Sequence, residues 1–343
     1  MNFFFVLFRE MDLVNEELLM KLNKDFENAE ELLKVIDPKE TPYESKYKAR
    51  TILKDIIEKL KNDLSDTRSH CQALIGGIFC HIGTIDVDVE EFSEAEKNLK
   101  KSLEHLEQVS SKEFKVLSLL KALNQLGILW CVRDDYQEAK TYLDKSLEEY
   151  NIFSSNHQDH LYELSDLFKA SKDILKPNFS DKESVLELIN THTHYYLAQV
   201  YEKIGNPSKS AECCHITLSK QLELKVFQPL DWSTNAAMLS QHYLAKEDYK
   251  SAKKLLMAAS VMLTRYESEL SSKELELEDD RNEMLIRCKS DVSRAWGKYS
   301  LLLLQRSLDH DIERIEQENQ LVEVTDDDQS TVSSKVQFKA NIN

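Results

Sequence analysis

The chain has 343 residues but only 6 glycines and 5 prolines, which is too few turn formers for an all-β protein and is typical of long helices with short connections. Its formal net charge of -17 argues against nucleic acid and anionic membranes as partners, because phosphate binding needs a surplus of Lys and Arg. The same charge predicts a partner with a basic protein surface. Six scattered cysteines without a secretory leader predict reduced thiols in the cytosol.

The first residues are apolar over Phe3 to Phe8, but this run is too short to span a bilayer and has no cleavage site. We therefore expect no membrane insertion, with Met11 as an alternative start. Charged and apolar residues alternate at helical spacing over 12–36. Residues 1–37 are thus predicted as a helical segment of uncertain start, ended by Pro38.

Pairs of small residues twelve positions apart recur four times beyond this segment. An aromatic usually follows the first small residue by three positions (Trp130, Tyr201, Tyr243), although the first copy has Asp86 there. Small residues let two antiparallel helices approach closely, so this recurrence predicts an all-α, tetratricopeptide-like helical-hairpin array, a right-handed α-solenoid. The alternative is a plain helical bundle with accidental similarity. The pairs are Gly83/Ala95, Gly127/Ala139, Ala198/Ser210 and Ser240/Ala252.

The array is predicted to cover 38–266, with an inserted loop at about 153–183 where the spacing lengthens. Asp135 with Glu138, and Ser93 with Glu96, have the spacing of capping boxes. Asn206 followed by Pro207 indicates an N-cap and a first helical residue. The four predicted helical pairs are 72–109, 114–152, 184–224 and 231–266.

Beyond the array, an acidic loop is predicted at 267–281, a long connecting helix at 282–317 and a disordered tail at 318–343. Arrays normally close with a polar capping helix. Because this one ends in a ragged tail, either the long helix is the cap or the chain is part of something longer.

Catalytic and metal-binding motifs are absent. The sequence has no phosphate-cradling glycine loop, HExxH or nucleophile elbow. His192 and His194, and Cys213 to His215, point in divergent directions on a helix, so they favour packing over zinc binding. The expectation is a protein that is not an enzyme and has no cofactor and no metal.

One stretch is more specific than a generic repeat. The run Thr-His-Thr-His-Tyr-Tyr-Leu-Ala-Gln-Val-Tyr at 191–201 resembles the kinesin-binding protein (KIF-binding protein) family. So do Leu-Gly-Ile-Leu-Trp at 126–130, Asn-Ala-Ala at 235–237 and Arg-Ala-Trp at 294–296. The resemblance covers about 38–305, in the family's order, and corresponds to its N-terminal half. Family members continue further with a second set of repeats, so the resemblance implies that this chain is truncated.

The resemblance implies a non-enzymatic regulator that engages kinesin motor domains at their basic, microtubule-binding face and blocks attachment. It thereby implies effects on organelle and mitochondrial transport, cytoskeleton organisation, axon growth, neurogenesis and differentiation, and a cytoplasmic, cytoskeleton-associated location. Tyr196, Gln199 and Gln221 match family residues implicated in motor contact. The alternative for Tyr196 is a place in the core.

In such arrays the groove is expected to be lined by the positions three before and one after the first small residue. These positions indicate Asn124, Tyr195, Gln199 and Gln241. A chaperone adaptor that captures acidic peptides would need basic residues where Cys80, Thr84, Ile128 and Ala237 stand. A generic scaffold for other helices is the second rival. The sequence leaves open which kinesins bind and the oligomeric state.

Overall fold

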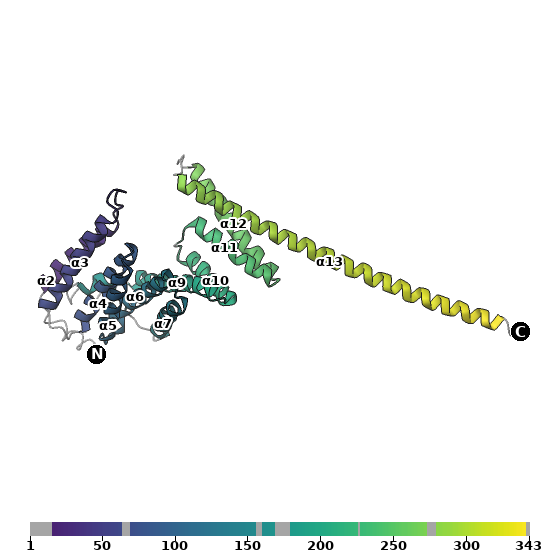
Figure 1. The fold of residues 1–343 in the computed structure, drawn as a ribbon, viewed down its shortest axis with the longest axis horizontal. Helices are drawn as coiled ribbons and strands as arrows, with labels where there is room; N and C mark the ends of the chain where they lie inside the picture. Colours follow the sequence, from purple (N-terminus) through teal and green to yellow (C-terminus); the bar gives the residue numbers. More distant parts are fainter. Residues whose placement is uncertain are drawn as a thin grey trace. The chain divides into compact units, whose positions relative to one another are not determined.

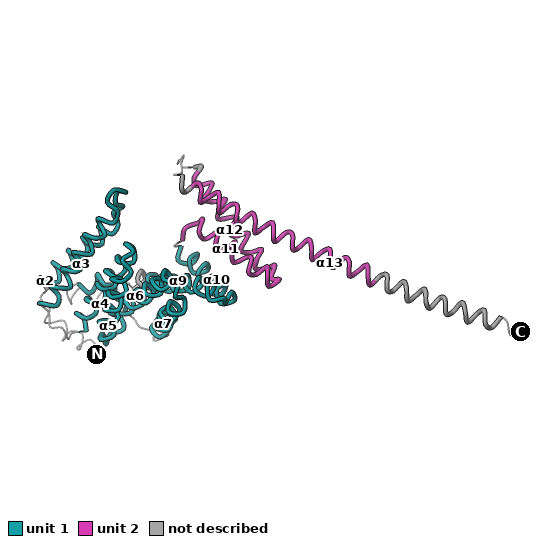
Figure 2. The backbone as a smooth tube through the Cα atoms, in the orientation of Figure 1, with its two compact units in different colours: residues 1–226 teal, residues 227–343 magenta. Residues whose placement is uncertain are grey.

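The computed structural model describes residues 16–63, 69–155, 160–168, 179–225, 227–272 and 279–340. In this part of the chain every regular element is a helix. The chain divides into two compact units, unit 1 (Met1–Val226) and unit 2 (Phe227–Asn343), which are described separately (Figure 2). The all-α fold predicted from the small-residue pairs is confirmed.

Unit 1 consists of helices that pack as successive pairs: α2 with α3, α4 with α5, α6 with α7, and α9 with α10 (Figure 1). Their bounds are α2 Glu16–Leu33, α3 Glu44–Asp63, α4 Ser69–Asp88, α5 Phe92–Glu107, α6 Lys112–Val132, α7 Tyr136–Ser155, α9 Phe179–Lys203 and α10 Pro207–Leu224, with a 3-10 helix η1 at Leu164–Phe168 between α7 and α9.

The N-terminal segment is a full member of the array. Leu22 and Phe26 of α2 are buried in one core with Leu53 and Ile56 of α3. The boundary predicted at residue 37 therefore falls inside a helical pair, between its two helices. The apolar stripe of α2 has to be covered, and α3 covers it.

All four predicted hairpins share one turn. The seventh residue after the first small residue has a positive φ, and the N–H of the eighth donates to the carbonyl of the third. Left-handed backbone at that point ends the first helix and satisfies one of its last carbonyls. The φ values are 63° at Glu90, 59° at Asp134, 76° at Gly205 and 58° at Glu247. The bonds are Glu91–Asp86 2.8 Å, Asp135–Trp130 3.0 Å, Asn206–Tyr201 2.8 Å and Asp248–Tyr243 2.9 Å.

The eighth residue also caps the second helix. Asp135 Oδ1 accepts from Glu138 N at 3.1 Å, Asn206 Oδ1 from Lys209 N at 3.2 Å and Asp248 Oδ1 from Ser251 N at 3.0 Å. In the first hairpin the equivalent residue is Glu91, which makes no side-chain cap bond. The box predicted for Ser93 is wrong, because α5 begins at Phe92 and Ser93 is already helical.

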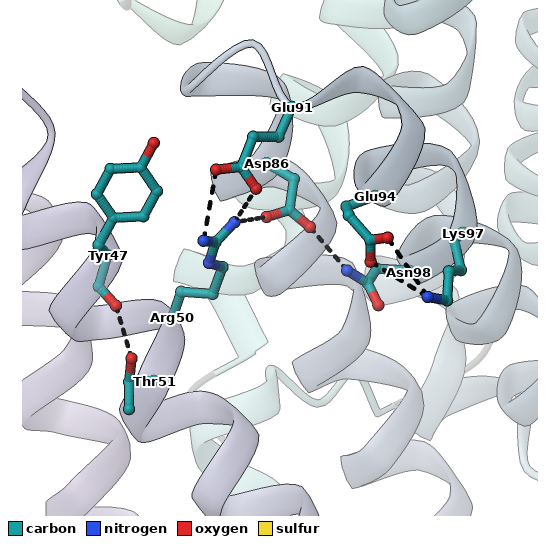
Figure 3. Close-up of polar contacts among 8 residues, drawn as sticks. All are labelled: Tyr47, Arg50, Thr51, Asp86, Glu91, Glu94, Lys97 and Asn98. Atoms are coloured by element: carbon teal, nitrogen blue, oxygen red, sulfur yellow. Dashed lines mark hydrogen bonds and ion pairs between the residues drawn. The ribbon is translucent and has the colours of Figure 1, made fainter.

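Glu91 instead binds Arg50 of α3 (Figure 3). Arg50 Nη1 lies 2.5 Å from Glu91 Oε2 and 2.6 Å from Oδ1 of Asp86, which is fully buried. Asn98 Nδ2 donates to the other Asp86 oxygen at 2.7 Å. Asp86 thus replaces the aromatic of the other copies because it binds a cation from the preceding pair.

The small residues occupy the helix contacts, as predicted. A Cβ added to Gly83 would lie 2.6 Å from Leu99 Cγ, and one added to Gly127 would lie 2.6 Å from Leu143 Cγ. Ala95, Ala139, Ser240 and Ala252 are fully buried, whereas Ala198 and Ser210 are half-buried. Trp130 is also half-buried, with the Arg133 guanidinium 4.9 Å from its ring centroid.

The first helices of the pairs form the inner layer of unit 1. In the described residues α4 packs on α6 and α6 on α9, while no comparable packing joins α5 to α7 or α7 to α10. The central α6 is long and apolar enough to cross a membrane by composition. Most of its apolar residues are buried against neighbouring helices, which accounts for its hydrophobicity.

The insertion predicted at 153–183 contains packed structure. Within it, Leu164, Leu167 and Phe168 of η1 are buried. Phe168 stacks on Phe26 of α2 with ring centroids 5.2 Å apart. The described part of the insertion is therefore a component of the N-terminal core; 156–159 and 169–178 lie outside the described residues.

Unit 2 contains the fourth hairpin, α11 (Pro229–Ala245) and α12 (Tyr249–Ser272), and the long helix α13 (Asp279–Ala340). α13 packs on both, and Trp296 Nε1 donates to Ser260 Oγ of α12 at 2.9 Å. The single array predicted for 38–266 is therefore divided, because the fourth hairpin shares its core with α13. α13 also continues past the predicted end at residue 317, since no glycine or proline interrupts 298–340.

Candidate partner-binding surface

Accessible side chains of the inner helices recur at fixed positions. Counted from the first small residue, they stand six and two before it and one and five after it, the 4-3-4 spacing of one helix face. We call this set in unit 1 the first-helix face. It comprises His81, Thr84 and Asp88 on α4, Lys121, Gln125, Ile128 and Val132 on α6, and His192, Tyr196, Gln199 and Lys203 on α9.

Of the two groove-facing positions predicted on each first helix, one is accessible and the other is mostly buried. The position one after the small residue is accessible, but the position three before it is buried at Cys80, Asn124 and Ala237. At 100° per residue, that second position lies about 70° from the centre of the accessible face and points toward neighbouring helices. Tyr195 is the exception, with 38% of its surface exposed.

Asn124 is consequently not a surface residue. It is 6% exposed, its Nδ2 donates to Ile189 O at 3.2 Å, and its Oδ1 accepts from Thr193 Oγ1 at 2.9 Å. Both ends of the amide thus tie α6 to α9. The prediction that Asn124 binds a partner is therefore wrong, because its side chain is buried between α6 and α9.

Tyr195, Tyr196 and Gln199 lie together on α9. The two rings meet edge to face with centroids 5.2 Å apart. Tyr196 is half-buried against the core of the second and third hairpins, and burial raises the pKa of its hydroxyl, so it stays neutral. The ring of Tyr196 therefore packs against this core and is still partly exposed. This position is intermediate between the partner-binding and core positions that the sequence left open. Gln199 is exposed.

Gln221 stands apart from this group. It is half-buried on the second helix α10. Its neighbour Lys220 contacts Glu187 at 3.3 Å, which places this end of α10 beside residue 187 of α9. Twelve residues separate Glu187 from Gln199, or about 18 Å along the helix. The structure does not bring Gln199 and Gln221 to one site.

Gln241 belongs to unit 2. It is half-buried on α11, one position after Ser240, and Met238 beside it is 56% exposed. Sequence reasoning passed over Gln125 and Val132 as surface positions and treated a contact through Met238 as doubtful. The signal that could have found them is the helical period itself, carried two before and five after each small residue.

The first-helix face is not acidic, although the net charge of the chain predicts a basic partner. It carries Lys121, Lys203 and Asp88, and Asp88 pairs with Lys46 at 2.8 Å. Burial and the nearby Lys121 lower the pKa of His81 to about 4, so this histidine is neutral. Several exposed carboxylates of the hairpins lie on second helices beside lysines, as in the Glu96–Lys100 pair at 2.6 Å.

No group of three His, Cys, Asp or Glu side chains in the described ranges could hold a metal ion. Burial raises the pKa of Cys131 and Cys214 to about 11, so these thiols stay protonated at neutral pH. The first-helix face can therefore contact a partner mainly through aromatic, aliphatic and amide side chains.

Stacked antiparallel hairpins with an accessible inner face define a helical-repeat protein of the tetratricopeptide-like class. A family model described as "KIF-1 binding protein C terminal" matches residues 230–341. KIF-binding protein of Gallus gallus is 33% identical over 289 residues, covering 83% of this chain and 48% of the relative. That of Danio rerio is 32% identical over 305 residues, covering 78% and 48%.

Two solved structures of KIF-binding proteins are also similar to this chain. The "Cryo-EM structure of KIFBP core" has a TM-score of 0.56 at 28% identity, covering 84% of this chain and 91% of that one. "Kinesin binding protein (KBP)" has a TM-score of 0.57 at 30% identity, covering 82% and 52%. The chain belongs to the KIF-binding protein family. It spans about half the length (48%) of the relatives from chicken and zebrafish.

Proposed function

We propose that this chain binds kinesin motor domains and prevents their attachment to microtubules, without a chemical step. The printed name of its relatives, KIF-binding protein, supports the class of partner. The observation that carries the proposal is the group of Tyr195, Tyr196 and Gln199, because it lies on the accessible side of α9 within the run that resembles the family.

The proposed mode is capture of a helix on the first-helix face. Anchored aromatic rings supply contact area at low entropic cost, and exposed amides supply hydrogen bonds that fix the register. A motor helix held there could not simultaneously lie on the microtubule. Because the face is close to neutral, apolar and amide contacts should dominate affinity, with only weak dependence on salt.

The cellular consequences belong to the same proposal. A cytoplasmic, cytoskeleton-associated regulator of this kind would affect transport of organelles such as mitochondria, cytoskeleton organisation and axon growth. Binding by a chain half the length of its relatives requires that the described hairpins suffice for capture.

The test is a pull-down of a panel of kinesin motor domains by the 343-residue chain, followed by microtubule co-sedimentation. Tyr195→Ala and Gln199→Ala should lose capture, because both side chains are accessible on α9. Gln137→Ala, an exposed glutamine on the second helix α7, is the matched control and should retain it. Gln221→Ala is measured separately because Gln221 lies on the second helix α10, apart from the α9 group.

Capture that survives both α9 substitutions would remove these residues from the site. If the unmodified chain captures none of the motor domains, the proposal fails and a scaffold for other helices takes its place. Unchanged circular dichroism in every variant shows that loss of capture is not loss of fold.

A second candidate has one observation in its favour. Lys121 and Lys203 both lie on the first-helix face, where a chaperone adaptor would place cations for an acidic peptide. Fluorescence anisotropy with an acidic C-terminal peptide, compared between the unmodified chain and Lys121→Ala, decides this. Absence of binding to the unmodified chain excludes the adaptor.

A further inference from the structure

α13 has two apolar faces, of which α11 and α12 cover one. The covered face is formed by Leu285, Cys288, Val292, Ala295 and Tyr299, none more than 9% exposed. Further along, Leu301, Leu304, Leu308, Ile312 and Ile315 are 64%, 59%, 54%, 53% and 51% exposed. We call these five the α13 stripe. At 100° per residue the two faces lie about 180° apart, so the stripe does not continue the covered face.

The α13 stripe is a contiguous surface. Its spacing of three, four, four and three residues keeps all five side chains within one side of the helix. In Figure 1, α13 continues past the ends of α11 and α12, and no other described helix of unit 2 lies beside that part of it. Contiguous exposed aliphatic side chains of this extent mark an interaction surface.

Gly297 points to a close helical neighbour on the same side. It lies one turn before Leu301, within about 20° of the centre of the stripe. A Cβ added there meets nothing within 4 Å, so the described packing does not require a glycine. A mid-helix glycine costs about 0.5–1 kcal/mol relative to alanine, and close approach of another group to the backbone is one reason for having one.

The stripe is symmetric about Leu308. Its members stand seven and four residues before Leu308 and four and seven after it. A second copy running antiparallel, with the two Leu308 side chains opposed, therefore places Leu301 on Ile315 and Leu304 on Ile312. A two-fold axis needs such a self-complementary patch.

The charges beside the stripe fit the antiparallel arrangement. Lys298 and Glu316 are both exposed and flank the stripe along the same edge. In the antiparallel register, Glu316 of one copy falls within two residues of Lys298 of the other, and symmetry makes this contact twice. A parallel pair instead brings Asp309 of one copy toward Asp311 of the other, which is repulsive. We propose that the α13 stripe is a homodimer interface that pairs two copies of this chain antiparallel about Leu308.

The test is sedimentation velocity of the 343-residue chain over a wide concentration range. The expected result is a reversible monomer–dimer equilibrium. Leu308→Asp opposes two carboxylates at the two-fold axis and should leave only monomer. His310→Asp adds the same charge to an exposed position on the other side of α13 and should leave the dimer intact. Circular dichroism should show equal helix content in both variants.

A charge exchange tests the orientation without altering the apolar contacts. Lys298→Glu should weaken the dimer at least tenfold, and adding Glu316→Lys should restore it. Disulfide trapping is the second readout: Leu301→Cys should cross-link to Ile315→Cys in a mixture but not to itself, with the unmodified chain as background. Self-linking of Leu301→Cys would overturn the antiparallel register.

A chain that is monomeric at every concentration overturns the proposal, as does a dimer that persists in Leu308→Asp. Capture of a different protein by a monomeric chain through the same residues would assign another occupant to the stripe and would equally overturn self-pairing.

Discussion

Arg50 of α3 holds the buried carboxylate of Asp86 at the end of α4, with Nη1 2.6 Å from Oδ1 (Figure 3). The other three hairpins have an aromatic ring where Asp86 stands. The first hairpin is therefore joined to the N-terminal pair by a charge contact across two helices. The irregular copy of the repeat is the one that follows the α2–α3 pair, which lacks the small-residue spacing of the other pairs.

Arg50→Met should destabilise unit 1 by about 3–5 kcal/mol, because it leaves the Asp86 carboxylate buried and without its cation. Urea denaturation followed by circular dichroism measures the change. Lys48→Met is the control: its pair with Glu44 is at the surface, with side chains 61% and 50% exposed, so its loss should leave the urea midpoint nearly unchanged. A similar small loss in both variants would show that Asp86 tolerates isolation.

Gly83→Ala should destabilise by about 1–3 kcal/mol, because the new Cβ overlaps Leu99 and forces α4 and α5 apart. The distance to Leu99 Cγ would be 2.6 Å without movement. Gly297→Ala is a matched change in open space and should raise the stability of an isolated chain by about 0.5–1 kcal/mol. The melting temperatures of the two variants, measured at low concentration where self-association is least, should shift in opposite directions. Equal shifts would contradict the helix contact assigned to Gly83.

The four hairpins could be predicted because their information is local. Turn, cap and helix contact all fall within the twelve positions between two small residues, so one pattern carries all three. The α2–α3 pair escaped the pattern because its turn is built differently. There the positive φ falls on Tyr43, immediately before α3, and the buried small residues Ala29 and Ala49 stand twenty positions apart instead of twelve.

The candidate surface was harder to predict because it depends on which helices become neighbours. Asn124 occupies a groove position by counting, yet its partner Thr193 is 69 residues away in sequence. Only the packing of α6 on α9 reveals that contact. The net charge gave a wrong expectation for this face for a similar reason, since composition does not say where the acidic residues lie, and Glu94 and Glu96 lie beside lysines on the second helix α5.

Phe168→Ala should destabilise unit 1 by about 3–5 kcal/mol by leaving a cavity. The reason is that Phe168 is 1% exposed and stacks on Phe26, so the insertion is part of the core. Ile36→Ala, at a position 95% exposed, is the control and should change the urea midpoint little. Near-native stability of Phe168→Ala would contradict this and would show that the insertion behaves as a surface loop.

Unit 1 should lose stability between about pH 6.5 and pH 4 through His70. Burial lowers the pKa of His70 from 6.5 to about 4, and the ring packs edge-on against Phe114 with centroids 6.1 Å apart. As pH falls below 6.5, the unfolded chain binds a proton that the folded chain refuses, so the free energy of unfolding decreases. The loss is complete near pH 4 and amounts to about 3 kcal/mol.

His70→Leu removes this contribution, so the fall in its stability over the same pH range should be shallower than that of the unmodified chain by about that amount. The comparison uses the difference between pH values within each protein, which cancels any change in packing at neutral pH. Because His310 is exposed, His310→Leu should keep the full slope. Urea denaturation at a series of pH values measures all three proteins, and parallel curves for His70→Leu and the unmodified chain would show that buried His70 accepts its proton without cost.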